Sequence, residues 1–194
     1  MPLIVETIVT TMSGDGRVHI APLGLIEDGE GWIIAPFKPS RTLDNLVANP
    51  CAVASHTDDV RVFAGCVTGR RDWPVAPAEH IKGVYLQSAL THWELKVQRL
   101  TEDDQRPRFH CKLVHQCVHA PWPGFNRAQV AVLELAVLTT RLHMLPPSKI
   151  ETELQYLEIA VSKTAGPRER EAWGWLMERV EAWRRGDTSA IEKR

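Results

Sequence analysis

Residues 35–46 read APFKPSRTLDNL, and the interpretation of the whole chain starts from this stretch. The apolar run 31–36 leads into two prolines, after which Ser40 or Thr42 stands where a helix N-cap belongs. The helix that follows must end at Asn49-Pro50, because proline disfavours the helical conformation of the residue before it. The stretch therefore predicts a strand, a tight corner and a short helix.

The predicted corner has the features of an anion site. The first N–H groups of a helix lack partners within the helix and lie at the positive end of its dipole. A phosphate placed there would meet these amides, the hydroxyls of Ser40 and Thr42 and the guanidinium of Arg41. An ordinary capped helix with a solvated arginine fits the same spacing, and on spacing alone it is the commoner arrangement.

Three antiparallel strands are expected around and before this corner. Residues 3–12 and 18–26 are rich in Ile, Val and Thr, and they flank a turn; the run before the corner is the third strand. Pro22 cannot donate to a strand ladder, so it indicates an edge or a bulge. Gly24 removes a side chain two residues later, so the main chain there either lies against a flat ligand or makes a bulge with no further role.

The run SRTLDNL, with HIAPLG at residues 19–24 before it, resembles the FMN-binding split barrel of the flavin reductase-like superfamily. Within that superfamily the chain is most similar to an uncharacterised family of archaea and methylotrophic bacteria with a C-terminal helical addition. The resemblance implies an α+β fold, an antiparallel split β-barrel over residues 1–125, with FMN as the cofactor. It also implies that the corner, including Asn45, holds the flavin phosphate, and that the strand with residues 21–24 passes beside the isoalloxazine ring.

Two further places are candidates for flavin contact. In related split barrels the end of the fourth strand, expected at residues 51–56, approaches the flavin, although a structural role is commoner for a lone histidine at a strand end. The resemblance implies that Arg127 reaches the flavin phosphate or an acidic substrate, although pairing with Glu134 or a neighbouring carboxylate is the commoner role of an arginine at a helix start. No catalytic residue is assigned, because flavin chemistry resides in the cofactor. The cofactor-binding candidates are Ala21, Pro22, Leu23, Gly24, Ser40, Arg41, Thr42, Asn45, His56, Thr57, Asp58 and Arg127.

The middle of the chain predicts a hairpin that closes the barrel. Residues 92–100 and 108–118 alternate apolar and polar side chains, whereas residues 60–66 fit a strand or a helix. The loop that contains Trp73 fits a lid or a dimer contact. Four cysteines without a Cys-x-x-Cys pair indicate reduced, buried thiols.

The second arm of this hairpin carries several potential metal ligands. Cys111, Leu113, His115, Cys117 and His119 are expected on one face, because strand side chains repeat every two residues. Such residues lie along a line about 7 Å apart and do not converge on a tetrahedral ion. We therefore expect a mixed core and interface face, and no metal site.

The period of the sequence changes after residue 125. Asn126 can cap a helix that runs to about residue 144, Ser148 and Glu151 predict the start of a second helix, and a third helix follows Gly166-Pro167. The expected organisation is a split barrel over residues 1–125, a three-helix bundle over 126–186 and a flexible tail over 187–194.

Composition limits the possible partners. The 194 residues include 23 basic and 24 acidic side chains, and a net charge of −1 provides no field that would attract nucleic acid or an anionic membrane. No apolar run approaches the roughly 20 residues that a membrane span needs. These features predict a cytoplasmic protein. The resemblance implies a homodimer, because in the resembling proteins a second subunit covers the flavin ring.

Two functions follow from this sequence. The first is an FMN-dependent oxidoreductase that moves electrons between a reduced nicotinamide or deazaflavin and a small molecule. The alternative is a flavin-binding carrier or assembly subunit, without catalysis of its own, that docks a partner through its helical bundle.

Overall fold

The computed structural model describes residues 2–29 and 31–187, and these form two compact units. The first unit consists of the described residues up to Thr57 together with residues 73–122. The second consists of residues 58–72 together with those from 123 onward. Of the expected tail 187–194, only Asp187 belongs to the described residues.

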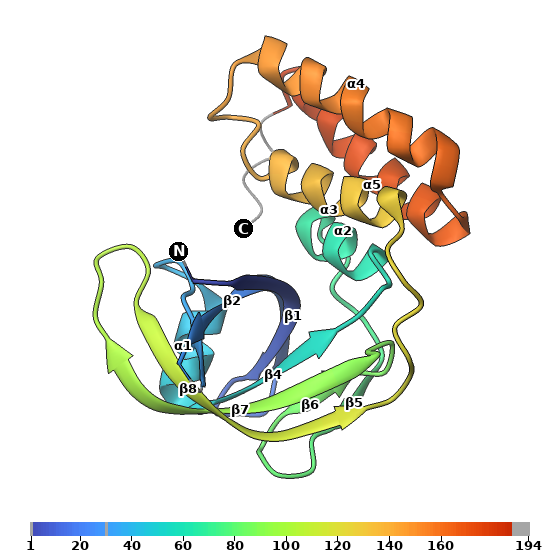
Figure 1. The fold of residues 1–194 in the computed structure, drawn as a ribbon. Helices are drawn as coiled ribbons and strands as arrows, with labels where there is room; N and C mark the ends of the chain where they lie inside the picture. Colours follow the sequence, from blue (N-terminus) through green and yellow to red (C-terminus); the bar gives the residue numbers. More distant parts are fainter. Residues whose placement is uncertain (1, 30, 188–194) are drawn as a thin grey trace. The chain divides into compact units, whose positions relative to one another are not determined.

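The first unit is a closed, antiparallel, six-stranded barrel with the strand order β1-β2-β3-β8-β7-β4 (Figure 1). This confirms the expected α+β fold with an antiparallel barrel. β3 pairs with β2 only at the three residues that end β2, so among the described residues 18–25 have β1 as their only paired strand. The strands are β1 (Ile4–Met12), β2 (Val18–Asp28), β3 (Gly31–Ile34), β4 (Cys51–His56), β7 (Thr91–Thr101) and β8 (Arg108–Val118).

Side chains alternate along each strand, and one set fills the barrel. Each fully buried Leu, Ile or Phe in such a core contributes about 1.5–3 kcal/mol relative to exposure. The core consists of Val9, Leu25, Ile34, Leu46, Ala52, Ala54, Leu95, Phe109 and Cys111.

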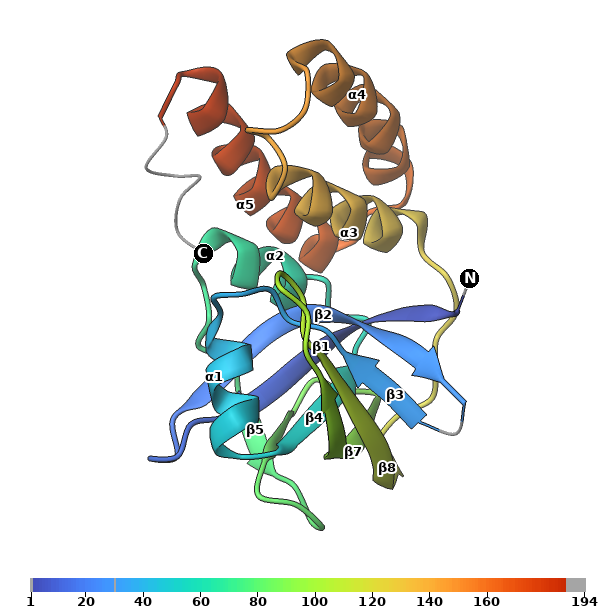
Figure 2. The ribbon, with the colours of Figure 1, turned by 90° about the vertical axis from the view of Figure 1, so that its left-hand side faces the viewer.

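Helix α1 (Arg41–Ala48) packs against β1 and β2 (Figure 2). As expected, Ser40 is its N-cap and the helix ends before Asn49-Pro50. The side-chain amide of Asn45 donates to the hydroxyl of Thr11 at 3.0 Å, which ties the helix to β1.

A two-stranded ribbon, β5 (Val75–Pro77) and β6 (Val84–Leu86), covers the outer face of the barrel. The hydroxyl of Thr10 donates to the carbonyl of Val84, and the amide of Leu86 donates to the hydroxyl of Ser55 at 3.1 Å. Of the loop expected to form a lid or a dimer contact, residues 75–77 form β5 and pair with β6.

The β7–β8 ladder has a register shift between Glu94 and Leu95, and this corrects the expected face of β8. Glu94 pairs with His115, but Leu95 pairs with Leu113, so β8 has one extra residue at this point. Leu113 packs against the barrel core together with Leu95, whereas His115 lies beside Glu94. A bulge changes which face a side chain occupies, and the simple period-two expectation was wrong here.

The second unit is helical, and it includes a helix from the middle of the chain. Residues 61–68, which the sequence left open between strand and helix, form α2 within this unit. The three expected C-terminal helices are present, although α3 ends earlier than expected and the cap of α4 is Pro146 instead of Ser148. The helices are α2 (Arg61–Thr68), α3 (Arg127–Thr139), α4 (Pro147–Thr164) and α5 (Pro167–Arg184).

The four cysteines are free thiols, as expected. Cys66 and Cys111 are buried, and Cys51 and Cys117 are half-buried. Burial raises the pKa of Cys66 to about 11 and that of Cys111 to about 12, so both remain unreactive thiols at neutral pH. In the described part of the chain, no helix has the length and apolar character that crossing a membrane requires.

Candidate functional site

The corner before α1 places two of the predicted side chains within reach of a ligand. The hydroxyl oxygen of Ser40 accepts a hydrogen bond from the amide of Leu43 at 3.3 Å, which leaves its proton available for a second acceptor. Arg41 is exposed at the first position of the helix. The other two α1 candidates, Thr42 and Asn45, are buried, and Asn45 is already bonded to β1.

This corner fits a phosphate group. An exposed guanidinium, a hydroxyl with a free proton and the first amides of a helix all lie within one turn of chain. These are the donors that phosphate sites at helix N-termini use. Anion binding by Ser40 and Arg41 stays a prediction, and Asn45 has a packing role that the sequence did not predict.

Residues 21–24 lie on the part of β2 whose second edge has no strand partner among the described residues. The position of Pro22 there agrees with the expectation of a strand edge, because proline has no N–H to contribute to a ladder. The Leu23 side chain packs against the barrel core.

The sequence suggested that Gly24 leaves space for a ligand, but in the structure this space is filled. A Cβ atom at this position would lie 2.7 Å from Cγ2 of Ile4 and 3.4 Å from Oε1 of Glu6. Side chains of β1, the neighbouring strand in the ladder, therefore occupy the space that a side chain at Gly24 would need. Any ligand contact of this strand must come from its free edge or from its other residues.

His56, at the end of β4, is half-buried, and its imidazole lies against the ring of Trp93 with ring centroids 4.3 Å apart. Neither ring nitrogen has a hydrogen-bond partner among the described residues. Burial lowers the pKa of His56; the Thr91 backbone lies near the ring but does not reach hydrogen-bond geometry, so it offsets this effect only in part. The ring is therefore predominantly neutral at pH 7. Thr57, next in the chain, donates to the carbonyl of Ser88 at 2.8 Å.

The ladder places His56 two strands away from the candidate residues of β2. Ile8 of β1 pairs with Pro22 on one side and with Ser55, the neighbour of His56, on the other. Asp58 and Arg127 belong to the helical unit, where Arg127 is exposed at the first position of α3. The candidates of α1 and β2, together with His56 and Thr57, all belong to the barrel unit.

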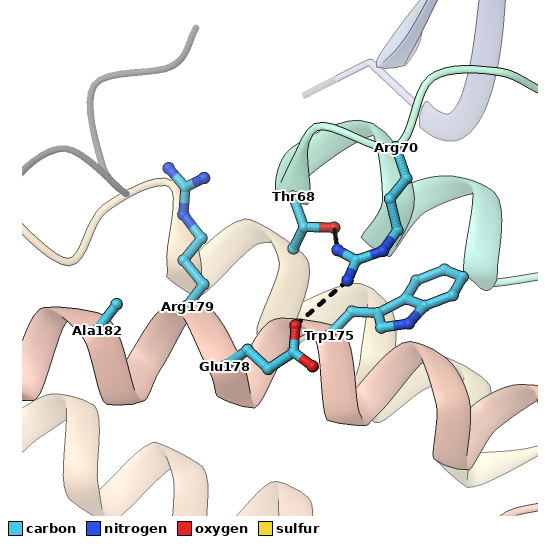
Figure 3. A pocket seen from close by; sticks show the side chains of 6 residues that line it. All are labelled: Thr68, Arg70, Trp175, Glu178, Arg179 and Ala182. Atoms are coloured by element: carbon cyan, nitrogen blue, oxygen red, sulfur yellow. Dashed lines mark hydrogen bonds and ion pairs between the residues drawn. The ribbon is translucent and has the colours of Figure 1, made fainter.

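The helical unit has a pocket of about 180 Å³ between α2 and α5 (Figure 3). Its polar groups are largely engaged with one another: Arg70 pairs with Glu178 at 3.2 Å and donates to Thr68 at 2.9 Å. The guanidinium of Arg70 also lies 4.7 Å from the centroid of the Trp175 ring. These contacts join the two helices, and we assign no chemistry to this pocket.

A group of polar rings on the outer face of the barrel was not predicted from the sequence. Nδ1 of His92 lies 2.7 Å from Nε2 of His119, and the ring of Tyr85 stacks on both. Tyr85 belongs to β6, His92 belongs to β7 and His119 directly follows β8, so only the fold brings them together. The spacing of His92 and Glu94 on β7 indicates that both side chains lie on one face of the strand. The sequence of the β5–β6 ribbon has no pattern that would predict that it covers this face.

Two family models match the chain. The N-terminal domain of "Protein of unknown function (DUF447)" matches residues 5–120, and a second DUF447 model matches residues 126–178. A search of curated proteins found no match.

Solved structures share the fold. An FMN-bound DUF447 protein from Methanosarcina mazei superposes with a TM-score of 0.79 at 23% identity, over 92% of this chain and 96% of that one. A 2-nitrobenzoate 2-nitroreductase from Pseudomonas fluorescens superposes with a TM-score of 0.51 at 19% identity, over 61% of this chain and 66% of that one. The flavin reductase component of a bacterial two-component tryptophan halogenase superposes with a TM-score of 0.52 at 14% identity, over 62% of this chain and 83% of that one. The family models together span most of the chain and both units, and the chain belongs to the DUF447 family.

Proposed function

We propose that the protein binds FMN and acts as an oxidoreductase, moving electrons between a reduced nicotinamide or deazaflavin and a small molecule. The observation that carries this proposal is the fold shared along nearly the whole length with an FMN-bound protein of the same family. Nitroreductase and flavin reductase folds among the similar structures support a redox role. Bound FMN would supply the electron transfer, and the protein would supply binding, orientation and exclusion of water.

The residues of the α1 corner would hold the phosphate. The Ser40 hydroxyl and the first amides of α1 would donate to its oxygens, and the exposed Arg41 would neutralise its charge. The free edge of β2 at residues 21–24 would lie beside the ring. His56 has two unused ring nitrogens close to Trp93 and is the candidate for a polar contact from β4.

The visible spectrum of the purified protein tests the cofactor. Oxidised flavin bands that remain after desalting would support the proposal, and protein that stays colourless after incubation with FMN would contradict it. Anaerobic mixing with NADH, NADPH or a reduced deazaflavin then tests the redox role. Bleaching of the flavin band by one donor supports the oxidoreductase. Bound FMN that none of the donors reduces would favour the carrier function.

The variant Ser40→Asp tests the position of the phosphate. Aspartate is as good an N-cap as serine, so the thermal stability of the apoprotein should be retained. Its negative charge would lie where the phosphate is proposed, so FMN binding should weaken by roughly tenfold or more while riboflavin binding changes little. Ser162→Asp adds the same charge to the exposed Ser162 of α4 and serves as the control. Unchanged FMN binding in Ser40→Asp would exclude this corner.

A further inference from the structure

The outer face of the β7–β8 hairpin carries imidazoles and carboxylates that the proposed flavin chemistry does not use. Trp93 and Leu95 pack with the barrel core, so Glu94 between them points to the outer face. His115, its partner in the ladder, lies on the same side because of the bulge described above. The turn between β5 and β6 places Glu79 and His80 over this pair.

Glu94 organises the turn above it. One of its carboxylate oxygens accepts the amide N–H of Glu79 and the other accepts that of His80, both at 2.8 Å. The backbone of both turn residues is therefore held in place, which leaves their side chains beside His115.

The three side chains at this point have unused ligand atoms. Nε2 of His115 is buried without a hydrogen-bond partner among the described residues. Oε2 of Glu79 lies 4.0 Å from it, too far for a hydrogen bond, and the ring centroid of His80 lies 4.2 Å from that of His115. One ligand atom from each of the three residues lies within 4.8 Å of the other two.

We propose that Glu79, His80 and His115 bind a divalent transition-metal ion, with zinc as the best match. Imidazole and carboxylate ligands suit zinc, whereas sites for magnesium or calcium are built from oxygen ligands. Ligand bonds of about 2.0–2.2 Å require ligand atoms about 3.4 Å apart, so the observed atoms need to approach by roughly 1 Å. The Glu79 side chain is 65% exposed and free to make this movement.

Two neighbouring groups are less suited to an ion. His92 and His119 already share a hydrogen bond of 2.7 Å, which is shorter than the separation of two ligands on one ion. In the group of His92, Glu94 and His115, both oxygens of Glu94 accept backbone amides, and His92 and Glu94 are fully buried. The turn, by contrast, is open to solvent, and three protein ligands leave a further coordination position for water.

The ion would join the β5–β6 turn to β8. Potential ligands that follow one another along a single strand lie too far apart to bind one ion. Here only His115 comes from β8, and the other two ligands come from the β5–β6 turn. The site does not involve the residues proposed for FMN, so either proposal can fail while the other stands.

Equilibrium dialysis of the untagged, flavin-loaded protein tests the site. After chelator treatment, the protein is dialysed against a zinc series and the bound zinc is measured by mass spectrometry. We expect one zinc per chain, and we expect His80→Ala and Glu79→Gln each to weaken zinc affinity by tenfold or more. Both side chains are exposed, so the variants should melt like wild type without zinc. His143→Ala, at an exposed histidine of the helical unit, should bind zinc as wild type does.

Four results would overturn the assignment. The first is less than one tenth of a zinc per chain at saturation. The second is wild-type affinity in both His80→Ala and Glu79→Gln. The third is a His119→Ala variant that loses zinc while His80→Ala retains it, which would move the site to the Tyr85 stack. If a tenfold excess of magnesium displaces the zinc, the ligand set is not the one proposed.

Discussion

Arg41 is the residue whose role is easiest to isolate, because its side chain is exposed and it begins a helix that Ser40 already caps. Charge-assisted hydrogen bonds to a phosphate contribute about 1.5–3 kcal/mol each. Arg41→Ala should therefore weaken FMN binding by roughly tenfold or more and leave riboflavin binding nearly unchanged. Titration calorimetry with both ligands measures the two affinities. Equal losses for the two ligands would exclude a phosphate contact, and Arg17→Ala, at an exposed arginine of the β1–β2 turn, is the matched control.

His56 gives a residue-scale prediction about pH. Burial lowers its pKa in the folded protein below the unfolded value of about 6.5, so the unfolded state binds more protons as the pH falls through that range. The free energy of unfolding should thus decrease from pH 7.5 to pH 5.5. His56→Phe keeps the ring contact with Trp93 and should show a smaller decrease. Urea titrations at the two pH values measure the free energy of unfolding. His143→Phe, at an exposed histidine, is the control. An unchanged decrease in His56→Phe would show that this ring does not carry the effect.

At the scale of the element, β2 combines a free edge with a close contact to β1. Because a Cβ at Gly24 would lie 2.7 Å from Cγ2 of Ile4, Gly24→Val should destabilise the apoprotein by about 1–3 kcal/mol through overpacking. Adding Ile4→Ala removes the obstructing group, so the double variant should be little less stable than Ile4→Ala alone. Thermal melts of the four apoproteins measure this coupling.

The same four proteins test whether β2 lies beside the flavin. If it does, Gly24→Val alone should reduce the stabilisation by FMN, because the added side chain displaces the strand that contacts the ring, and adding Ile4→Ala should restore that stabilisation. Full FMN stabilisation in the single variant Gly24→Val would contradict a contact of this part of β2 with the ring.

At the scale of the whole molecule, we propose a homodimer. The barrel unit exposes large apolar side chains, and a stable interface typically buries about 1,200–2,000 Å² in total. These side chains include Leu3, Ile4, Phe37, Val47 and Val118, each at least half exposed. Sedimentation equilibrium at micromolar concentration should give the mass of two chains, with one FMN per chain. A monomer that retains FMN would contradict the proposal.

The local elements were predictable because their causes are local. The Ser40 cap and the proline stop after Asn49 act within one helical turn, and β4 follows from a short apolar run before a polar cluster. The strand pairs that are adjacent in sequence, β1–β2 and β7–β8, follow from alternation and turn residues. The sequence by itself therefore determined the main strands of the barrel, the three C-terminal helices and the capped corner before α1.

Tertiary structure alone decided the contacts between distant segments. The register shift at Glu94 moves His115 to the outer face, and no period within β8 reveals it. The side chain of Ile4 fills the space at Gly24, which is 20 residues away in the chain. Glu94 holds the turn at residues 79–80 because burial makes two backbone amides its available partners. Such contacts depend on which surfaces meet when the barrel closes, and side-chain patterns along one strand carry no information about the segment that will cover it.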